Sequence, residues 1–180
     1  GSFDKTPSIV SYWIEENIDP NESCRVVLVD HEGKGSAVKV GMVSAGGTYR
    51  LMCDADLAVS PEQIGKFVDY IEHGNYDIVI GSRQVGGAQR LHDSPLRYFT
   101  GRLFNWFVRA IAVPGIQDTQ CGYKCFTKEA AEYLFQKQRV KGWGFDVEIL
   151  FLAVKENMDI LEMPVSWVNV EKSKVQINKA

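Results

Sequence analysis

The sequence lacks long apolar runs and a surplus of positive charge. No window approaches the roughly 18 consecutive apolar residues that a membrane-spanning helix needs, and no signal-like segment begins the chain. We therefore expect that this stretch of chain does not itself cross a membrane. The formal net charge of -3 argues against nucleic acid as a partner, because binding of a phosphate backbone needs a basic surface. Any anionic partner must be bound by local groups.

Cysteine and histidine are scarce and show no metal-binding pattern. The cysteines have neither the paired spacing of a zinc site nor the density of a disulfide scaffold; they are Cys24, Cys53, Cys121 and Cys125. They lie in or beside apolar segments, so we expect reduced, buried structural thiols of a cytosolic protein. The three histidines also lack the spacing of metal ligands.

The composition is that of one soluble domain with a hydrophobic core, since 45% of the 180 residues are apolar and 24% are charged. Helical and extended patterns alternate without a repeat or linker, which predicts a single domain over residues 1–180. The expected strands are 24–30, 48–53, 76–82, 120–126 and 160–168. The expected helices are 7–18, a small-residue helix ending near Ala45, 60–72, 95–113, 128–137 and 145–156. This order predicts an α/β fold, with a mostly parallel sheet covered by helices on both faces.

The stretch CDADL at 53–57 follows a predicted strand and precedes a helix start. Asp54 and Asp56 should therefore lie at the carboxyl end of a strand, where open α/β sheets bind ligands. Two neighbouring carboxylates repel each other unless a cation joins them. Mg²⁺ or Mn²⁺ bridging to a substrate diphosphate is the natural occupant. The alternative is an acidic turn in which Asp56 only caps backbone groups.

Two basic residues are expected near the same edge of the sheet. Lys34 lies between two glycines at a helix start, where it could hold phosphate or sugar oxygens. The stretch is not a Walker A loop, because Leu28 stands where that motif requires glycine. Arg83 follows the strand 76–82 and is either a ligand for an anion or an ordinary surface arginine.

The second half of the chain adds a polar cluster in DTQCGYK at 118–124. Asp118, Gln120 and Lys124 surround a glycine there, and such groups need partners if they are buried. In GWGFDVEIL, the side chains of Asp146 and Glu148 would point about 200° apart on a helix, so they cannot form one acidic pair. Asp146 is expected to cap its helix.

Within the helix expected at 95–113, the stretch 97–113 mixes aromatic residues with arginines. Aromatic residues at helical spacing are typical of a protein core. The same mixture is also typical of a helix that lies at a membrane interface. Both interpretations remain open at this point.

Taken in order, these motifs resemble the inverting family 2 glycosyltransferases of the GT-A (Rossmann-like) fold. The matching stretches are GKGSAVKVGM, DADL, GSR, DTQCGYKCF, GWGFDVEIL and EMPVSWVNVEKSK. Within the family the chain is most similar to the polyprenyl-phosphate sugar synthases, the dolichyl-phosphate glucosyltransferases first and the mannosyltransferases next. The likeness covers almost the whole chain, and the order of the motifs is more specific than any one of them.

The resemblance implies transfer of a hexose from a nucleotide sugar, UDP-glucose in preference to GDP-mannose, to dolichyl or another polyprenyl phosphate, with inversion. The acceptor is already an anionic phosphate, so no strong general base is needed; the enzyme must instead hold two anions in line and neutralise the leaving diphosphate. The resemblance also implies a divalent metal and association with a membrane surface. The expected location is the cytosolic face of the endoplasmic reticulum in a eukaryote, or the inner face of the plasma membrane in a prokaryote.

Individual roles follow from the positions that match the family's motifs. The metal ligands would be Asp54 and Asp56, and the catalytic residues would be Arg83, Arg97 and Asp118. The substrate-binding residues would be Asp4, Lys34, Asp54, Arg83, Gln120 and Lys124. Arg97 would face the acceptor phosphate.

The sequence departs from the family's pattern at several points. Mannosyltransferases often carry a glutamine as a further metal contact where this chain has Ala58, which favours the glucosyl type, and His31 replaces a common asparagine. Family members begin with two strands and a DGSxDxT turn, and GSFDKT at 1–6 matches the end of that turn. We therefore expect those strands to precede Gly1, because without them the sheet would lose its middle.

Two other functions remain compatible with the sequence. The first is a GT-A transferase that acts on a soluble glycan or protein. The second is a non-catalytic fragment that binds a nucleotide sugar. Transfer to a water-soluble acceptor but not to dolichyl phosphate would favour the first of them.

Overall fold

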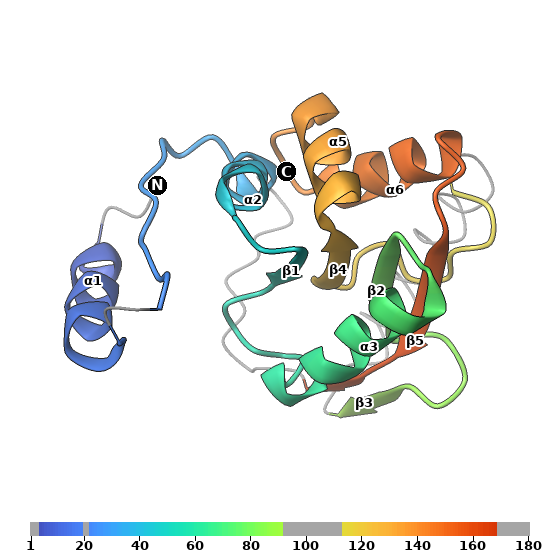
Figure 1. Cartoon of the computed structure of the whole chain (residues 1–180), viewed down its shortest axis with the longest axis horizontal. Coiled ribbons are helices and arrows are strands. Elements are labelled where there is room, and N and C mark those ends of the chain that lie inside the picture. Colours follow the sequence, from blue (N-terminus) through green and yellow to red (C-terminus); the bar gives the residue numbers. More distant parts are fainter. Residues whose placement is uncertain (1–3, 20–21, 92–112, 169–180) are drawn as a thin grey trace.

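A four-stranded mixed sheet forms the centre of the molecule (Figure 1). The computed structural model describes residues 4–19, 22–91 and 113–168. The sheet has the order β1-β4-β2-β5 and consists of β1 (Tyr49–Cys53), β2 (Ile78–Ser82), β4 (Tyr123–Thr127) and β5 (Ile160–Pro164). β4 runs antiparallel to both neighbours, whereas β2 and β5 are parallel. A second, parallel pair is formed by β3 (Gln89–Leu91) and β6 (Ser166–Val168).

Helices pack on both faces of the sheet. The described helices are α1 (Thr6–Asn17), α2 (Lys34–Ser44), the 3-10 helix η1 (Pro61–Gln63), α3 (Ile64–Gly74), α5 (Lys128–Lys137) and α6 (Phe145–Lys155). Of these, α2, α5 and α6 cover one face of the sheet and α3 covers the other. Side chains of β2 alternate between two cores, because successive residues of a strand point to opposite faces. Ile78 and Ile80 belong to the core under α2, α5 and α6, whereas Val79 belongs to the core under α3.

The predicted α/β class with helices on both faces is confirmed, and the sheet is more mixed than expected. The expectation of parallel strands holds where one crossover helix joins two strands of a sheet. β2 and β4 are instead joined through residues 83–122, a connection that contains β3. The chain therefore enters β4 at the edge of the sheet where β2 ends, and β4 runs antiparallel to β2.

The prediction of a buried strand at 24–30 is wrong. This segment forms no strand, and Leu28 is 72% exposed. A strand needs a neighbour for its backbone N–H and C=O groups, and no described strand pairs with this segment. The helix before it, α1, lies apart from the sheet in Figure 1 and buries none of its residues.

Three smaller expectations are corrected or left open. The strand expected at 160–168 is divided at Val165 between β5 and β6, which belong to different sheets. Cys121 and Cys125 are buried as expected, but Cys24 and Cys53 are exposed. The helix expected at 95–113 lies almost wholly outside the described residues. Within the described ranges, no helix is both long and apolar enough to cross a membrane.

The start of α2 packs directly against the loop that precedes α6. A Cβ atom at Gly35 would lie 2.6 Å from the carbonyl oxygen of Val140 and 2.8 Å from Cβ of Phe145, so only glycine fits there. The side-chain amide of Gln138 donates to the carbonyl oxygen of Gly35 at 2.9 Å and fixes the same contact. The position of Lys34, the first residue of α2, depends on this close approach.

We expect Gly35→Ala to destabilise the protein and Gly41→Ala, in the same helix, to stabilise it. The first substitution overpacks a tight contact and should cost about 1–3 kcal/mol of unfolding free energy. The second meets nothing within 4 Å, and alanine in a helix should add about 0.5–1 kcal/mol. Urea unfolding at 25 °C measures both. Equal stabilities of the two variants would contradict the close approach of α2 to the loop.

Candidate functional site

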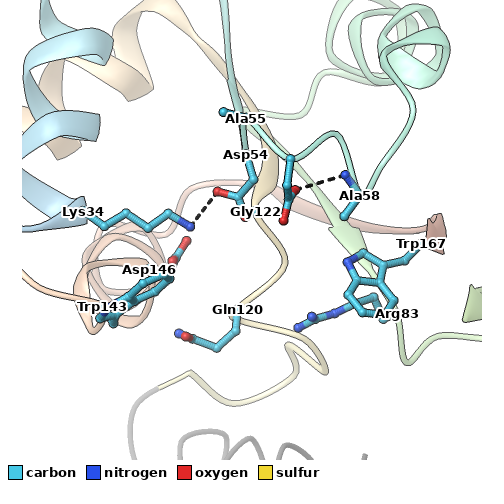
Figure 2. Close-up of a pocket in the computed structure, with 11 residues that line it drawn as sticks. Lys34, Asp54, Ala55, Ala58, Arg83, Gln120, Gly122, Trp143, Asp146 and Trp167 are labelled. Atoms are coloured by element: carbon cyan, nitrogen blue, oxygen red, sulfur yellow. Dashed lines mark hydrogen bonds and ion pairs between the residues drawn. The ribbon is translucent and has the colours of Figure 1, made fainter. Parts of the chain in front are cut away.

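A pocket of about 320 Å³ opens at the carboxyl ends of β1 and β2 (Figure 2). Its wall combines carboxylates, cations, an amide and two indole rings. The lining residues are Lys34, Asp54, Ala55, Asp56, Ala58, Arg83, Gln120, Gly122, Trp143, Asp146 and Trp167. The position agrees with the rule that α/β sheets bind ligands beyond the carboxyl ends of their strands.

Asp54 and Asp56 stand on the tight turn that follows β1. The N–H of Asp54 donates to the carbonyl oxygen of Gly122 at 3.1 Å, which joins the turn to the start of β4. The carboxylate of Asp56 accepts the N–H of Ala58 at 3.1 Å, so the expected capping contact is present. Leu57, which lies between Asp56 and Ala58, has φ 52°. This left-handed backbone conformation is strained for a bulky side chain. Strain of this kind is concentrated at functional sites.

Lys34 extends from the start of α2 to the carboxylate of Asp54. Its Nζ lies 2.6 Å from Oδ1 of Asp54, and Figure 2 shows this pair across the top of the pocket. The same ammonium group lies 5.0 Å from the centre of the Trp143 ring and 5.9 Å from that of Phe145. Cation–π contacts and the ion pair therefore hold the charge of Lys34 at the pocket.

Gly122 leaves room for the Asp54 carboxylate. A Cβ atom at this position would lie 2.0 Å from Oδ2 and 2.3 Å from Cγ of Asp54. Any larger residue would displace the carboxylate, because the backbone of Gly122 already contacts the side chain of Asp54. The glycine in DTQCGYK is thus part of the site although it carries no functional group.

The buried carboxylate of Asp118 holds Arg83. Its oxygens accept from Nε of Arg83 at 2.7 Å, from Nη2 at 2.9 Å and from the backbone N–H at 3.0 Å. Burial alone would raise the pKa of Asp118, but the hydrogen bonds and charge of Arg83 outweigh burial and lower that pKa below its ordinary value. The guanidinium group also lies 5.7 Å from the Trp167 ring centre. Arg83 thus reaches the pocket in one fixed orientation.

A second buried ion pair supports the floor of the pocket. Nζ of Lys124 lies 2.5 Å from Oδ1 of Asp146 and 2.6 Å from the carbonyl oxygen of Cys121. Asp146 stands in the first turn of α6, and its carboxylate pairs with Lys124. Within the described part of the chain, Asp146 makes no hydrogen bond to a backbone N–H, so the expected cap is not found there. The expected separation from Glu148 is confirmed, since Glu148 accepts backbone N–H groups of the loop before α6.

The turn at 54–58 offers two carboxylates to a cation. Hard cations such as Mg²⁺ and Mn²⁺ prefer carboxylate oxygens, and each carboxylate keeps lone pairs beyond its present contact. The described residues contain no group of three or more histidine, cysteine or acidic side chains able to hold a metal. A cation at Asp54 and Asp56 would therefore complete its shell with water and substrate oxygens, as Mg²⁺ commonly does.

The pocket unites most of the residues that the sequence indicated. Those that line it are Lys34, Asp54, Asp56, Arg83 and Gln120. Nε2 of Gln120 is buried and has no hydrogen-bond partner among the described residues, so it offers a donor at the pocket floor. Asp118 and Lys124 lie behind the lining, each paired with a lining residue.

Two predicted site residues are not placed in the pocket. Asp4 accepts the N–H of Thr6 at 2.9 Å at the start of α1 and does not line the pocket. Arg97 lies outside the described residues. Sequence reasoning missed Trp143 and Trp167, although both stand in stretches that carried the resemblance.

Known proteins are similar in sequence to this chain over most of its length. A model of the family described as Glycosyl transferase family 2 matches residues 1–132. The chain is 39% identical over 181 residues to a dolichyl-phosphate beta-glucosyltransferase of Dictyostelium discoideum, covering 97% of this chain and 55% of the relative. It is 34% identical over 189 residues to the Homo sapiens protein of that name, covering 97% and 56%. The chain thus spans little more than half the length of these relatives.

Solved structures share the fold at low sequence identity. Glucosyl-3-phosphoglycerate synthase from Mycobacterium tuberculosis, in complex with phosphoglyceric acid, matches with a TM-score of 0.65 and 16% identity, covering 97% of this chain and 59% of that one. The same enzyme in complex with Mn²⁺ and UDP-glucose gives a TM-score of 0.60 and 15% identity, covering 99% and 60%. At such identities the likeness concerns the fold alone.

We expect Asp118→Asn to destabilise the protein most at neutral pH. Removing one partner of a buried ion pair costs about 3–5 kcal/mol. The folded pKa of Asp118 lies below its ordinary 3.8, so its contribution is complete above pH 3.8 and is lost as the pH falls further. The stability difference between parent and variant should therefore narrow in strong acid. Denaturant unfolding at pH 7 and pH 3 tests this, and a constant difference would contradict it.

Proposed function

The chain belongs to glycosyl transferase family 2, and from that premise we propose that the protein transfers glucose from UDP-glucose to the phosphate of dolichol or a similar polyprenol, with inversion at the sugar carbon. The observation that carries the proposal is the pocket itself, where two carboxylates, Lys34 and Arg83 meet beyond the ends of β1 and β2. The names of the relatives support this choice of donor sugar and acceptor.

The donor side of the reaction is assigned to the turn after β1 and the two cations. Asp54 and Asp56 would hold Mg²⁺ or Mn²⁺, which when bound would neutralise the leaving diphosphate. Lys34 and Arg83 offer donors to phosphate or sugar oxygens from two walls of the pocket. Nε2 of Gln120, which has no hydrogen-bond partner among the described residues, can donate to a sugar hydroxyl or phosphate oxygen.

The acceptor side needs orientation more than proton removal. The nucleophile is a phosphate oxygen that is already anionic, so its approach must be guided against the charge of the donor. We assign the acceptor phosphate to Arg97 and a part in donor binding to Asp4, both on the resemblance to the family. Asp118 would contribute by orienting Arg83. Lys124 would contribute by pairing with Asp146, which lines the pocket.

Ala58 supports a glucosyl rather than a mannosyl donor. It has no side-chain oxygen for a metal, and its backbone is occupied, since its N–H meets Asp56 and its carbonyl oxygen accepts the N–H of Val168. Action on a lipid phosphate implies that the protein works at a membrane surface. We propose the cytosolic face of the endoplasmic reticulum in a eukaryote, or the inner face of the plasma membrane in a prokaryote.

The transfer is tested by incubating the intact protein with labelled UDP-glucose, Mn²⁺ and dolichyl phosphate. We expect a labelled lipid that partitions into organic solvent, formed faster than with GDP-mannose. Chelation of the divalent cation should abolish the product. No labelled lipid with either donor, or label only on a water-soluble acceptor, would refute the proposal.

Two substitutions test whether the turn after β1 binds the metal. Asp56→Asn keeps the oxygen that accepts the N–H of Ala58 but removes the charge, so Mn²⁺ binding should be lost while the unfolding free energy changes by less than about 0.5 kcal/mol. Gly122→Ala displaces the Asp54 carboxylate and should weaken Mn²⁺ binding by about tenfold or more. Electron paramagnetic resonance of free Mn²⁺ measures both.

The matched control for the alanine variant is Gly142→Ala, where a Cβ meets nothing within 4 Å. Its Mn²⁺ affinity should equal that of the parent. If Asp56→Asn binds Mn²⁺ as tightly as the parent, Asp56 is only a cap of its turn.

A further inference from the structure

Glu162 of β5 clamps the loop that carries Asp118. Its Oε1 accepts the N–H of Asp118 at 2.7 Å and its Oε2 accepts the N–H of Gln117 at 2.8 Å. One carboxylate thus receives two successive backbone N–H groups, and such charge-assisted bonds are short and strong. Glu162 itself does not line the pocket.

The clamp and Arg83 belong to neighbouring parallel strands. Glu162 stands opposite Ile80 in the pairing of β5 with β2, and Arg83 directly follows β2. The hydroxyl oxygen of Ser82 accepts the N–H groups of Gln84 and Val85, which turns the chain at Arg83. The sheet therefore fixes the distance between the clamp and the start of the Arg83 side chain.

Asp118 joins these two fixed points. Its backbone is held by Glu162, and its carboxylate accepts both the backbone N–H and the guanidinium fork of Arg83. The guanidinium group is planar and donates two N–H groups side by side, so the carboxylate that accepts both must lie in its plane at hydrogen-bond distance. A shift of the 117–118 loop would be transmitted to the guanidinium group, because buried packed groups move together.

We propose that Glu162 is a positioning residue for the pocket: by holding the N–H groups of residues 117 and 118 it orients Asp118 and, through Asp118, the guanidinium group of Arg83 that faces the donor. The inference rests on the proposed function only in taking UDP-glucose as the ligand. The geometric relay is independent of that choice.

Binding of UDP-glucose with Mn²⁺ to the intact protein, measured by calorimetry, tests the relay in a double-mutant cycle. Glu162→Gln keeps the shape but turns an amide N–H toward a backbone N–H, and we expect about tenfold weaker binding. Arg83→Lys keeps a cation but not the fork, so Glu162→Gln added to it should weaken binding by less than about twofold.

The matched control is Asp77→Asn at the opposite end of β2. Asp77 also accepts a backbone N–H, that of Asp159 at 2.9 Å, but it lies away from the pocket. The affinity of this variant for UDP-glucose should equal that of the parent, because the amide oxygen of asparagine can still accept that N–H. Equal losses from Glu162→Gln in the parent and in the Arg83→Lys background, or no loss in the parent, would overturn the relay.

A ligand-free measurement separates failure of the relay from failure of the proposed function. In ¹⁵N spectra of the intact protein, the Nε–H signal of Arg83, assigned by its absence in Arg83→Lys, should be protected from exchange with water. It should lose protection in Glu162→Gln and keep it in Asp77→Asn. If the parent binds no UDP-glucose, the donor assignment is wrong, and this signal alone decides the relay. Unchanged protection in Glu162→Gln would refute it.

Discussion

The antiparallel pairing of β4 with β1 is the constraint on which the site depends. It sets Cys53 opposite Tyr123, so that Asp54, just after β1, meets Gly122, just before β4. Residues that precede β4 therefore lie at the same edge as residues that follow β1 and β2. In an all-parallel sheet the residues that precede a strand would lie at the opposite edge, away from those that follow its neighbours. Gln120 and Gly122 line the pocket, and Asp118 lies behind the lining, because β4 is reversed.

Carboxylates beside the pocket explain how an acidic chain can present cations to an anion. Each pocket cation is held by a carboxylate, Lys34 by Asp54 and Arg83 by Asp118. These pairs keep their charges in place without a net basic surface, and they lose little further freedom when a ligand arrives. Preorganised charge of this kind is the main source of electrostatic catalysis. The buried ion pair of Lys124 and Asp146 makes the pocket wall more rigid without adding net charge.

Much of the architecture could be predicted from the sequence because its signals are local. The strand expected at 76–82, which carries the β-branched run of β2, is present. The helix expected from residue 60 begins with η1 and continues as α3, and the Ser60 hydroxyl accepts the N–H of Glu62 at its start. The segment 24–30 carried the same β-branched signal but forms no strand, since strand formation also requires a partner. Hydrophobicity alone does not specify that partner.

The site was predictable to the extent that its residues follow strands, which is why Asp54, Asp56 and Arg83 were placed correctly at one edge. The carboxylate of Glu162 and the rings of Trp143 and Trp167 could not be placed in the same way. Their roles arise from contacts between segments far apart in sequence, such as the clamp of β5 on residues 117 and 118. Trp167 illustrates the point: one bridge to Val59 ties it to the carboxylate turn, while its ring covers Arg83. The side chains that the sequence identified carry the charges, and the ones it missed fix where those charges point.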